Sequence, residues 1–464
     1  MNINQLSSDT RREFLKQTGR FAAAATLVSA ATPAVHAAED HTIRIALVGC
    51  GGRGNGAADQ ALSVKNGPIE IVALADVLQE KVKNTAGGLG KKFEKQFKVP
   101  KDQQFVGFDG YQKAMDCLRP GDIVILATPP AFRWVHFKYA MDKGLNVFME
   151  KPVAVDAPTA VRMFELAKES VKKNQKVGVG LMCRHCRARG DMFKRIKDGA
   201  IGDLTTMRAY RIAGHTAKES TPKKPANELS ELIWQIKWFH SFLWASGGAF
   251  SDFLIHNVDE CCWMKDAWPV EAQALGGRHD RGDNVDQNFD NYSVEYTFAD
   301  GAKLFLYGRT IDGCYGRHSS MAEGTKGSAI ISKSGHMPAL CRLFKTQQNE
   351  YTDPKAEEAA TIWQFGKPEP NPYQTEWDDL VDAVRNDKPY NEVERGAEAS
   401  LQAVLGRMAA HTGQRITRES LLKHDHEFAP DVDKLTMDSP APLVADADGK
   451  YPVPMPGKTV KREY

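Results

Sequence analysis

Two groups of residues in this chain have the chemistry of proton transfer. The first is Glu150-Lys151-Pro152, which directly follows a short apolar run. The Lys151 ammonium can hydrogen-bond a hydroxyl group and favour loss of its proton, and a nearby cation would lower the pKa of the lysine itself. The proline fixes the backbone, with a cis bond as one option, and so aims the lysine. A solvated surface lysine is the alternative interpretation.

The second group is Asp252 and His256, which follow Gly247 and Gly248. On a helix these two residues are one turn apart and share a face, and Asp259 lies one turn further. A carboxylate in that position can orient an imidazole and tune it for proton transfer, and the glycines leave space for a ligand. An N-capping aspartate with a packed histidine is the alternative.

A glycine-rich turn indicates which kind of ligand binds next to these two groups. The apolar run at 43–48 ends in Gly49-Cys-Gly51-Gly52-Arg53-Gly54 and continues into a helix-compatible segment. In that context the first glycine permits the turn, the second lets backbone approach a pyrophosphate, and the third lets helix and strand pack closely. N–H groups at the helix start face the phosphates, and Arg53 can pair with them. The turn predicts a dinucleotide site.

An acidic residue follows at the distance that such a site requires. Asp76 ends the apolar run 69–75, about twenty residues after the glycines, where a carboxylate accepts hydrogen bonds from the adenosine ribose. Its negative charge would oppose a 2′-phosphate, so NAD is favoured over NADP. Aspartate also caps helices well, and the two roles can coexist.

Alternating strands and helices must position these residues. Apolar strands are expected at 122–128, 146–149 and 177–180, with a helix at 157–172. This alternation predicts a doubly wound parallel sheet over 42–180, and ligands bind such sheets at the carboxyl ends of the strands. The residues expected beside the dinucleotide at these ends are Thr128, Pro129, Glu150 and Lys151.

The pattern changes in the second half of the chain. Longer strands near 204–212, 270–276, 291–298 and 303–310, with helices near 187–197, 374–385 and 392–411, predict an α/β domain over 181–428. Its large sheet should be open and mainly antiparallel, with one face solvated or buried in an oligomer. The tail at 429–464 is rich in proline and acids, which is typical of an extended arm or a partly disordered end.

Composition limits the kinds of binding partner, and the N-terminal segment indicates the cellular compartment. The 464 residues include 61 Lys and Arg against 59 Asp and Glu, so no strong field attracts nucleic acid or an anionic membrane. Residues 1–37 are expected to be a twin-arginine signal peptide, with Arg11-Arg12 before an alanine-rich run. That run is too short for a stable membrane span. We expect the twin-arginine translocase to export the folded protein to the periplasm.

The eight cysteines match neither a disulfide framework nor a zinc site. Cys183 and Cys186 have metal-ligand spacing, but Cys261 and Cys262 are adjacent on an expected helix and point in different directions. We expect no structural metal.

From about residue 43 to 413, the motifs resemble those of the Gfo/Idh/MocA oxidoreductases and follow one another in the same order as in that family. The matching motifs are Gly49-x-Gly51-x-x-Gly54, Asp76, Ala127-Thr128-Pro129, Glu150-Lys151-Pro152, Gly199-Ala-Ile-Gly202, Asp252-x-x-x-His256 and Gly324-Thr-Lys-Gly327. The resemblance implies a Rossmann domain, and an open sheet that often forms the interface of a homo-oligomer, here a dimer or tetramer. It implies proton transfer by Lys151 and His256 with help from Asp252; the terminal base stays open between the first two.

The function implied by this resemblance is NAD(P)-dependent oxidation or reduction at a secondary hydroxyl or ketone of a sugar, glycoside or polyol. Because the periplasm holds little free NAD, the cofactor should be tightly bound. Candidate substrate contacts are Arg184, His185, Trp238 and Asn257. One alternative is glycoside cleavage through transient ring oxidation, although such enzymes typically lack the lysine of Glu-Lys-Pro. Another is a non-catalytic sugar- or nucleotide-binding sensor.

Overall fold

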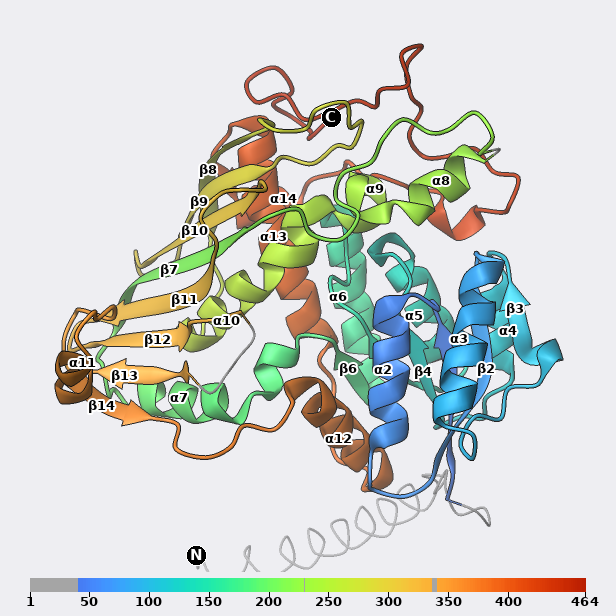
Figure 1. The fold of residues 1–464 in the computed structure, drawn as a ribbon, viewed down its shortest axis with the longest axis horizontal. Coiled ribbons are helices and arrows are strands. Elements are labelled where there is room, and N and C mark those ends of the chain that lie inside the picture. Colours follow the sequence, from blue (N-terminus) through green and yellow to red (C-terminus); the bar gives the residue numbers. More distant parts are fainter. Residues whose placement is uncertain (1–40, 229, 336–339) are drawn as a thin grey trace, which may run out of the picture. The chain divides into compact units, whose positions relative to one another are not determined.

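Two β-sheets organise the part of the chain that the structure describes, residues 41–464 without 229 and 336–339 (Figure 1). The structure is a computed structural model, and residues 42–464 form one unit in it. The predicted signal peptide at 1–37 lies outside the described residues. Within those residues, no helix is both long enough and apolar enough to cross a membrane.

The first sheet has six parallel strands in the order β3-β2-β1-β4-β5-β6. This is the strand order of a doubly wound dinucleotide-binding sheet, and it confirms the fold predicted for the first half. The strands are β1 (Ile43–Val48), β2 (Ile69–Asp76), β3 (Gln104–Val106), β4 (Ile123–Leu126), β5 (Asn146–Met149) and β6 (Val177–Val179).

Helices from the first half of the chain pack on this sheet, and helix 372–385 from the second half joins them. Those of the first half are α2 (Gly52–Ser63), α3 (Gln79–Lys92), α4 (Gly110–Asp116), α5 (Arg133–Asp142) and α6 (Ala157–Lys172). The α6 helix has the predicted bounds because its start carries a strong local signal. Asp156 accepts a hydrogen bond from the Thr159 N–H in a capping box, and Pro158 occupies the first turn.

The second sheet has nine strands in the order β14-β13-β12-β11-β7-β10-β9-β8-β15, mainly antiparallel as predicted, with β7 and β10 paired in parallel. The strands are β7 (Leu204–Ala213), β8 (Glu271–Gly277), β9 (Asn291–Thr297), β10 (Lys303–Thr310), β11 (Arg317–Gly324), β12 (Ser328–Ser332), β13 (Arg342–Phe344), β14 (Thr361–Gln364) and β15 (Ile416–Thr417). The strand β11 was not predicted because its start, Arg317-His-Ser-Ser, is polar.

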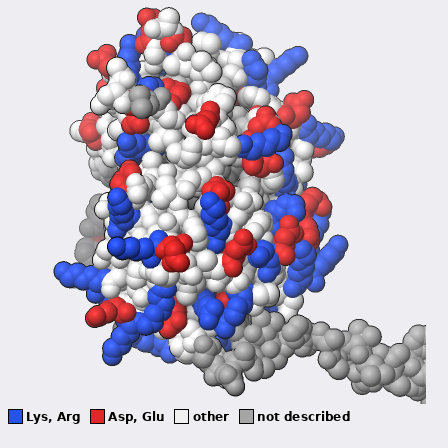
Figure 2. Space-filling view, turned by 90° about the vertical axis from the view of Figure 1, so that its right-hand side faces the viewer, with Lys and Arg blue, Asp and Glu red and all other residues white. Residues whose placement is uncertain are grey.

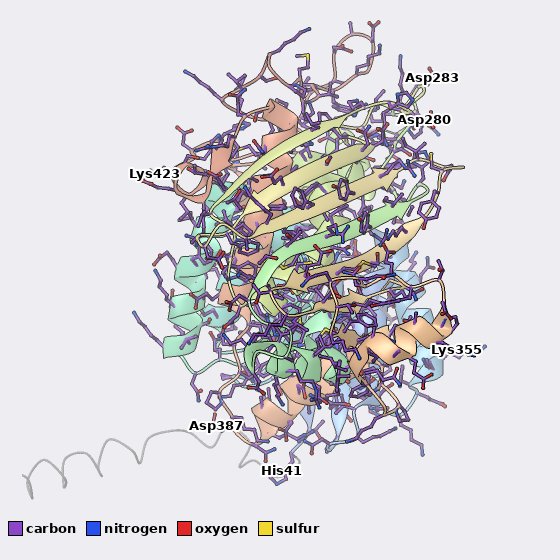
Figure 3. All side chains as sticks on the ribbon, turned by 90° about the vertical axis from the view of Figure 1, so that its left-hand side faces the viewer. His41, Asp280, Asp283, Lys355, Asp387 and Lys423 are labelled. Atoms are coloured by element: carbon purple, nitrogen blue, oxygen red, sulfur yellow. The ribbon has the colours of Figure 1, made fainter. Side chains whose placement is uncertain are left out.

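The two faces of this sheet differ in burial. On β10, Leu304 and Leu306 are fully buried on the inner face, while Leu275 on β8 points outward and is 78% exposed. Figure 3 shows the outer face, where side chains project from the strands, and one short helix, residues 354–360, packs on this face against β12 and β13. The helices of this half are α7 (Arg187–Lys197), α8 (Glu231–Lys237), α9 (Leu243–Ser246), α10 (Ile255–Lys265), α11 (Pro354–Ala360), α12 (Pro372–Arg385), α13 (Val393–Thr412) and α14 (Arg418–Leu422).

The tail at 429–464 follows an irregular path with a single 3-10 turn, η7 (Val432–Lys434), among its described elements. Several of its side chains are nonetheless buried, including Leu443, Tyr451 and Glu463. The tail is therefore an arm that packs against the body of the protein.

Charges of both signs are mixed on the face formed by the first half. Figure 2 shows Lys and Arg interspersed with Asp and Glu across this face, without a large area of one sign. Such a surface has no long-range field that favours one charge class of macromolecule.

Candidate active site

Each glycine of the turn has the surroundings that its predicted role requires. A Cβ at Gly49, where φ is +99°, would lie 2.5 Å from the Ala127 carbonyl carbon, and a Cβ at Gly54 would overlap the Gly49 carbonyl oxygen. By contrast, a Cβ at Gly51 would have no heavy atom within 4 Å. The open space therefore lies in front of Gly51, where backbone can approach a pyrophosphate at the start of α2.

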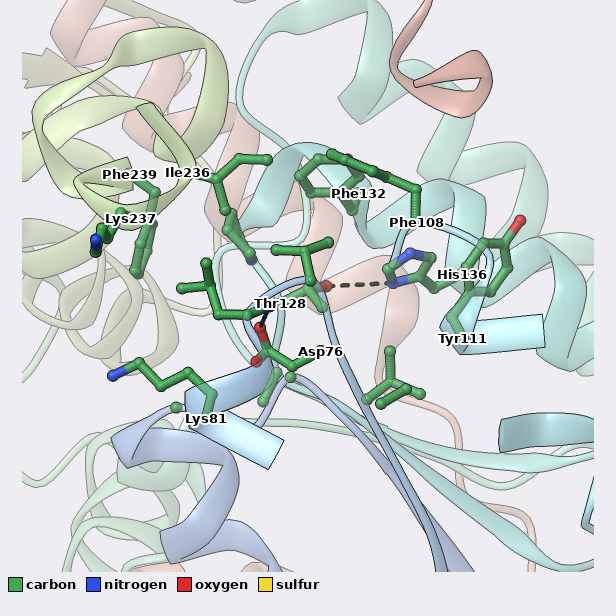
Figure 4. A pocket seen from close by; sticks show the side chains of 18 of the residues that line it. Asp76, Lys81, Phe108, Tyr111, Thr128, Phe132, His136, Ile236, Lys237 and Phe239 are labelled. Carbon is green, nitrogen blue, oxygen red and sulfur yellow. Dashed lines mark hydrogen bonds between the residues drawn. The ribbon is translucent and has the colours of Figure 1, made fainter. Parts of the chain in front are cut away.

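A cavity of about 300 Å³ opens at the carboxyl ends of β1, β2 and β4 (Figure 4). It contains six residues predicted to bind a dinucleotide: Gly49, Gly51, Gly52, Asp76, Thr128 and Pro129. Three aromatic side chains, Phe108, Tyr111 and Phe132, line the part beside β3 and β4 and offer apolar walls to a flat ring.

Asp76 faces this cavity from the end of β2. Its Oδ2 accepts a hydrogen bond from the Cys50 N–H at 2.7 Å, and its Oδ1 accepts one from the Leu78 N–H at 2.9 Å. Burial raises the pKa of Asp76, and these two backbone donors act against that rise. The carboxylate is therefore fixed beside the glycine turn, in the position expected for the ribose-binding acid.

The second half of the chain forms the opposite wall of the cavity. Ile236, Lys237, Phe239 and His240 reach it from residues 231–241, and Figure 4 shows Ile236, Lys237 and Phe239 facing the Rossmann side chains. Three lysines line the cavity, Lys81, Lys218 and Lys237, and Lys218 interacts electrostatically with the other two. This cationic group suits an anionic ligand. We call residues 214–241 the roof.

Thr128 is held at the end of β4 by buried neighbours. Arg133 donates to the carbonyl oxygens of Leu126 at 2.5 Å and Thr128 at 2.9 Å, and the Thr128 hydroxyl lies 3.2 Å from His136 Nδ1. Burial, aided by Arg133, lowers the pKa of His136 to about 3, so this ring is neutral. Sequence analysis did not identify Arg133, which carries no motif.

His240, in the wall of the cavity, belongs to a group in which one carboxylate joins two basic side chains. Lys151 Nζ donates to Asp252 Oδ1 at 3.0 Å and to the Asp252 carbonyl oxygen at 2.5 Å. His240 Nε2 lies 3.0 Å from Asp252 Oδ2. Burial opposes ionisation of Asp252, but Lys151 and His240 outweigh it and hold the pKa of this carboxyl well below its usual range. The structure thus brings the predicted Lys151 and Asp252 together and adds His240, which we had not predicted.

The start of the predicted helix differs from the expectation. Residues Phe250–Leu254 form a π-helical turn, and α10 begins only at Ile255. A π turn has wider spacing than the α-helix assumed for Asp252 and His256. His256 is 8% exposed on α10, and its role in proton transfer stays a prediction.

Comparison with known proteins identifies the family. Residues 43–180 match "Oxidoreductase family, NAD-binding Rossmann fold", and residues 191–330 match "GFO/IDH/MocA C-terminal domain". The chain belongs to the Gfo/Idh/MocA family. Both matched regions contribute walls of the cavity described above.

Curated relatives match the chain only in part. Inositol 2-dehydrogenase 3 of Saccharopolyspora erythraea is 25% identical over 237 residues, 51% of this chain and 58% of that protein. A glycosyl hydrolase family 109 protein of Streptomyces coelicolor is 28% identical over 167 residues, 35% of this chain and 33% of that protein. The matched regions thus span well under two thirds of the relatives' length.

Solved structures share the fold over most of the chain. An aldose-aldose oxidoreductase from Caulobacter crescentus gives a TM-score of 0.60 at 15% identity, covering 81% of this chain and 99% of that one. A scyllo-inositol dehydrogenase from Lactobacillus casei gives 0.58 at 18% identity, covering 82% and 98%. At these identities the likeness concerns the fold alone.

Two residues predicted at the dinucleotide site of this Gfo/Idh/MocA chain pair with each other. Arg53 Nε donates to Glu150 Oε1 at 2.6 Å, and Arg53 Nη2 donates to Gln60 Oε1 at 2.7 Å. Neither Arg53 nor Glu150 lines the cavity. The Arg53 guanidinium thus ties α2 to the Glu-Lys-Pro segment, and its pairing with a pyrophosphate stays a prediction.

Two of the predicted substrate contacts are also engaged within the protein. Arg184 makes a two-point ion pair with Asp259, at 2.9 Å and 2.7 Å. Asn257 is fully buried and donates to the Ser320 hydroxyl at 2.9 Å. Arg184 thus has a partner inside the fold, and Asn257 is buried with its Nδ2 engaged, so a substrate contact for either side chain stays a prediction. Trp238 lies in the roof, where Lys218 Nζ sits 4.8 Å from its ring centroid.

His185, the remaining substrate candidate, lies between two carboxylates. Its Nδ1 is 2.9 Å from Asp379 and its Nε2 is 3.2 Å from Glu392, and the ring is 7% exposed. Burial alone would lower the pKa of His185, but these two carboxylates raise it to about 9. The geometry supports an ionic link between α12 and α13 here, not a substrate contact.

This link predicts a pH dependence of stability. The folded state favours protonated His185, so the contribution is complete below the ordinary pKa of 6.5 and is lost as the pH rises toward about 9. The free energy of unfolding should fall by up to about 3 kcal/mol across this window. Urea titrations at pH 6, 7.5 and 9 would measure it. The same decrease in His185→Gln would contradict the assignment.

Arg211 on β7 is a further residue that sequence reasoning missed. The β7–β11 register places it opposite His318, and its Nη1 lies 2.7 Å from His318 Nδ1. Burial lowers the pKa of Arg211, while Glu219, Tyr373 and Asp252 raise it. Arg211 therefore interacts electrostatically with the carboxylate that holds Lys151. The sequence carries no motif at Arg211, and its neighbours become apparent only from the pairing of β7 with β11.

Proposed function

We propose that this protein is an NAD-dependent oxidoreductase that interconverts a secondary hydroxyl and a ketone on a sugar, glycoside or polyol. The observation that carries the proposal is a cavity at the glycine turn whose wall includes His240, the histidine that shares the Asp252 carboxylate with Lys151. Membership of an NAD-binding oxidoreductase family and the inositol dehydrogenase relatives support it.

The cavity fits a dinucleotide by its shape and its donor groups. Gly51 leaves the approach to backbone N–H groups open, Asp76 accepts ribose hydroxyls, and the lysines of the cavity neutralise phosphates. When bound, the nicotinamide supplies the hydride acceptor or donor for the two-electron exchange with the carbinol carbon.

The residues of this chain supply the proton chemistry. Two of the three N–H groups of Lys151 have acceptors on Asp252, which leaves the third to donate to a substrate oxygen. This bond strengthens as negative charge builds on that oxygen during hydride loss. The hydroxyl proton passes to His256; Lys151 can accept it through a hydroxyl relay only as the neutral amine, whose two N–H groups both donate to Asp252. Asp252 keeps the lysine in place by accepting from it twice.

The test is mass spectrometry of the dinucleotide released from the purified protein after incubation with sugars, polyols and glycosides. We expect NAD at close to one equivalent, converted to NADH by at least one compound of the panel. Protein that contains no nicotinamide dinucleotide and binds none on addition would contradict the proposal.

Tight cofactor binding and export belong to the same proposal. The roof comes from the second half of the chain and adds side chains to the wall of the cavity, which increases the surface that a dinucleotide can contact. We propose that the cofactor is loaded before export through the twin-arginine translocase and retained in the periplasm. Fractionation of cells that express the full chain, with the dinucleotide measured in each fraction, tests this.

We further propose a homo-oligomer that packs through the outer face of the nine-stranded sheet. Exposed Leu275 and the stacked Tyr210 and Tyr307 rings, 5.3 Å apart, lie on this face. Light scattering of the wild type and of Leu275→Lys tests the idea. A monomeric wild type would contradict it.

The Asp76 carboxylate predicts the dinucleotide preference. Asp76→Ala should weaken NAD binding by about tenfold, because two ribose hydroxyls lose a charged acceptor worth about 1.5 kcal/mol. Binding of NADP should be unchanged or tighter, since the lysines around the cavity remain. Fluorescence titration of cofactor-free protein with both dinucleotides would measure the change. Stronger wild-type binding of NADP than of NAD would contradict the preference.

Glycoside cleavage through transient ring oxidation is the second candidate, favoured by the similarity to a glycosyl hydrolase family 109 protein. It predicts release of a free aglycone without net change in the redox state of the bound dinucleotide. Lys151 argues against it. Chromatography of products from a chromogenic glycoside panel separates the two candidates.

A further inference from the structure

Arg407 on α13 is a fully buried arginine with an acceptor for each of its five N–H groups. Its Nη1 donates to the Gly247 carbonyl oxygen at 2.9 Å and to the Ser251 hydroxyl at 2.7 Å, and its Nη2 donates to the Val155 carbonyl oxygen at 2.8 Å. Its other two N–H groups bind a single carboxylate, Glu463. A guanidinium satisfied in this way has one fixed orientation.

The three acceptors of Arg407 outside the tail are the carbonyl oxygens of Gly247 and Val155 and the Ser251 hydroxyl. They belong to the two segments that carry the candidate catalytic residues. Ser251 directly precedes Asp252, and Val155 is four residues after Lys151. The second segment is attached to α13 again where the Val153 N–H donates to the Ser400 hydroxyl at 3.0 Å. Arg407 is therefore a common anchor for both partners of the Lys151–Asp252 ion pair.

The Gly247 position shows how closely the anchor is packed. Gly247 has φ +74°, and a Cβ there would lie 2.6 Å from Arg407 Nη1. The backbone of the Asp252 segment can reach the guanidinium only because residue 247 has no side chain.

Glu463 in the tail neutralises this anchor. Its two carboxylate oxygens accept from Arg407 at 2.8 Å and 2.9 Å, and His411 Nδ1 lies 2.6 Å from Oε2. Burial opposes ionisation of Glu463, but Arg407 and His411 lower its pKa to about 2. Without this carboxylate, buried Arg407 would lose the counter-ion that it contacts directly and keep the smaller electrostatic interaction with Asp156, so we expect the anchor to rearrange.

We propose that Glu463 is a positioning residue: through Arg407, the tail sets the geometry of Lys151 and Asp252. The proposal rests on the proposed function, because it takes these two side chains as the catalytic pair. The tail acts at a distance, since Glu463 touches the anchor and neither catalytic side chain. Displacement of reacting groups by about 1 Å can cost about 100-fold in rate, so a loosened anchor should be visible in turnover.

The test compares Glu463→Gln with Glu427→Gln as a matched control. Glu427 makes a two-point ion pair with Arg162 at 2.9 Å and 3.1 Å, close to the start of the tail, but contacts neither catalytic segment. For Glu463→Gln we expect turnover to fall about 10- to 100-fold with the NAD dissociation constant changed less than about twofold. The control should keep wild-type turnover, and Glu463→Asp should recover part of the loss.

A second measurement does not depend on catalysis. Reductive methylation of Lys151, followed by peptide mass spectrometry, reports how firmly Asp252 holds the ammonium, and Glu463→Gln should accelerate it several-fold over the control. Labelling and turnover equal to those of the control would overturn the proposal. If Glu463→Gln does not fold, the same comparison with Glu463→Asp decides. If no compound of the panel changes the redox state of the dinucleotide in the wild type, the proposed function fails. The labelling rates still test the positioning role in that case.

Discussion

Lys151→Ala is expected to lower turnover by about 10²- to 10⁴-fold, the range that positioned acid–base groups supply. The side chain is held by two acceptors on Asp252, so its removal takes away the ammonium that we propose donates to the substrate oxygen. Because Lys151 does not line the cavity, dinucleotide binding should change little. Single-turnover reduction of the bound dinucleotide is the measurement.

A matched control separates chemistry from packing. Lys176 is another lysine with low exposure, 4% as a residue. It pairs with Asp387 at 2.8 Å, and neither residue belongs to the candidate site. Lys176→Ala removes a comparable side chain and should leave turnover intact. Turnover of Lys151→Ala within about threefold of the wild type would remove Lys151 from the mechanism, because general acid–base groups contribute far more than that.

Gly51→Val is expected to abolish dinucleotide binding while the protein stays folded. A Cβ at this position meets no heavy atom within 4 Å, and its φ of −77° suits any residue. The valine side chain would then fill the space where backbone approaches a pyrophosphate, so we expect affinity to fall by at least about 100-fold. Isothermal titration of cofactor-free protein with NAD measures this loss.

Gly54→Ala is the informative contrast to this variant. Its Cβ would overlap the Gly49 carbonyl oxygen, so α2 must move away from β1 and the melting temperature of the cofactor-free protein should fall by several degrees. For Gly51→Val the melting temperature should stay within about 2 °C of the wild type. Wild-type affinity for NAD in folded Gly51→Val would place the dinucleotide elsewhere.

The sequence predicted the first sheet well because its strands carry continuous apolar runs and its glycine turn has a physical role at each position. The helix α3 was not predicted, since Gly87, Gly88 and Gly90 weaken its pattern. In the second half, alternation identified β9 and β10 nearly to the residue, while polar β11 gave no such signal.

The site was predictable where chemistry and local context coincide. Lys151 before a proline and Asp252 after two glycines were both found, although 101 positions separate them. His240 has no comparable signal, because only the folded chain brings it to Asp252. The sequence suggested Arg184 and His185 as substrate contacts and gave no sign of their ion pairs. The carboxylates that engage them come from distant segments, which a single sequence cannot pair.

The roof also has a consequence for cooperativity. A dinucleotide in the cavity would touch both the parallel sheet's domain and residues 214–241 of the other, so its binding free energy is lost when either half unfolds. At a concentration of 1,000 times the dissociation constant, such a ligand adds about 4 kcal/mol to stability. Calorimetry should therefore show residues 42–464, which form one unit, melting at a higher temperature with the ligand than without it.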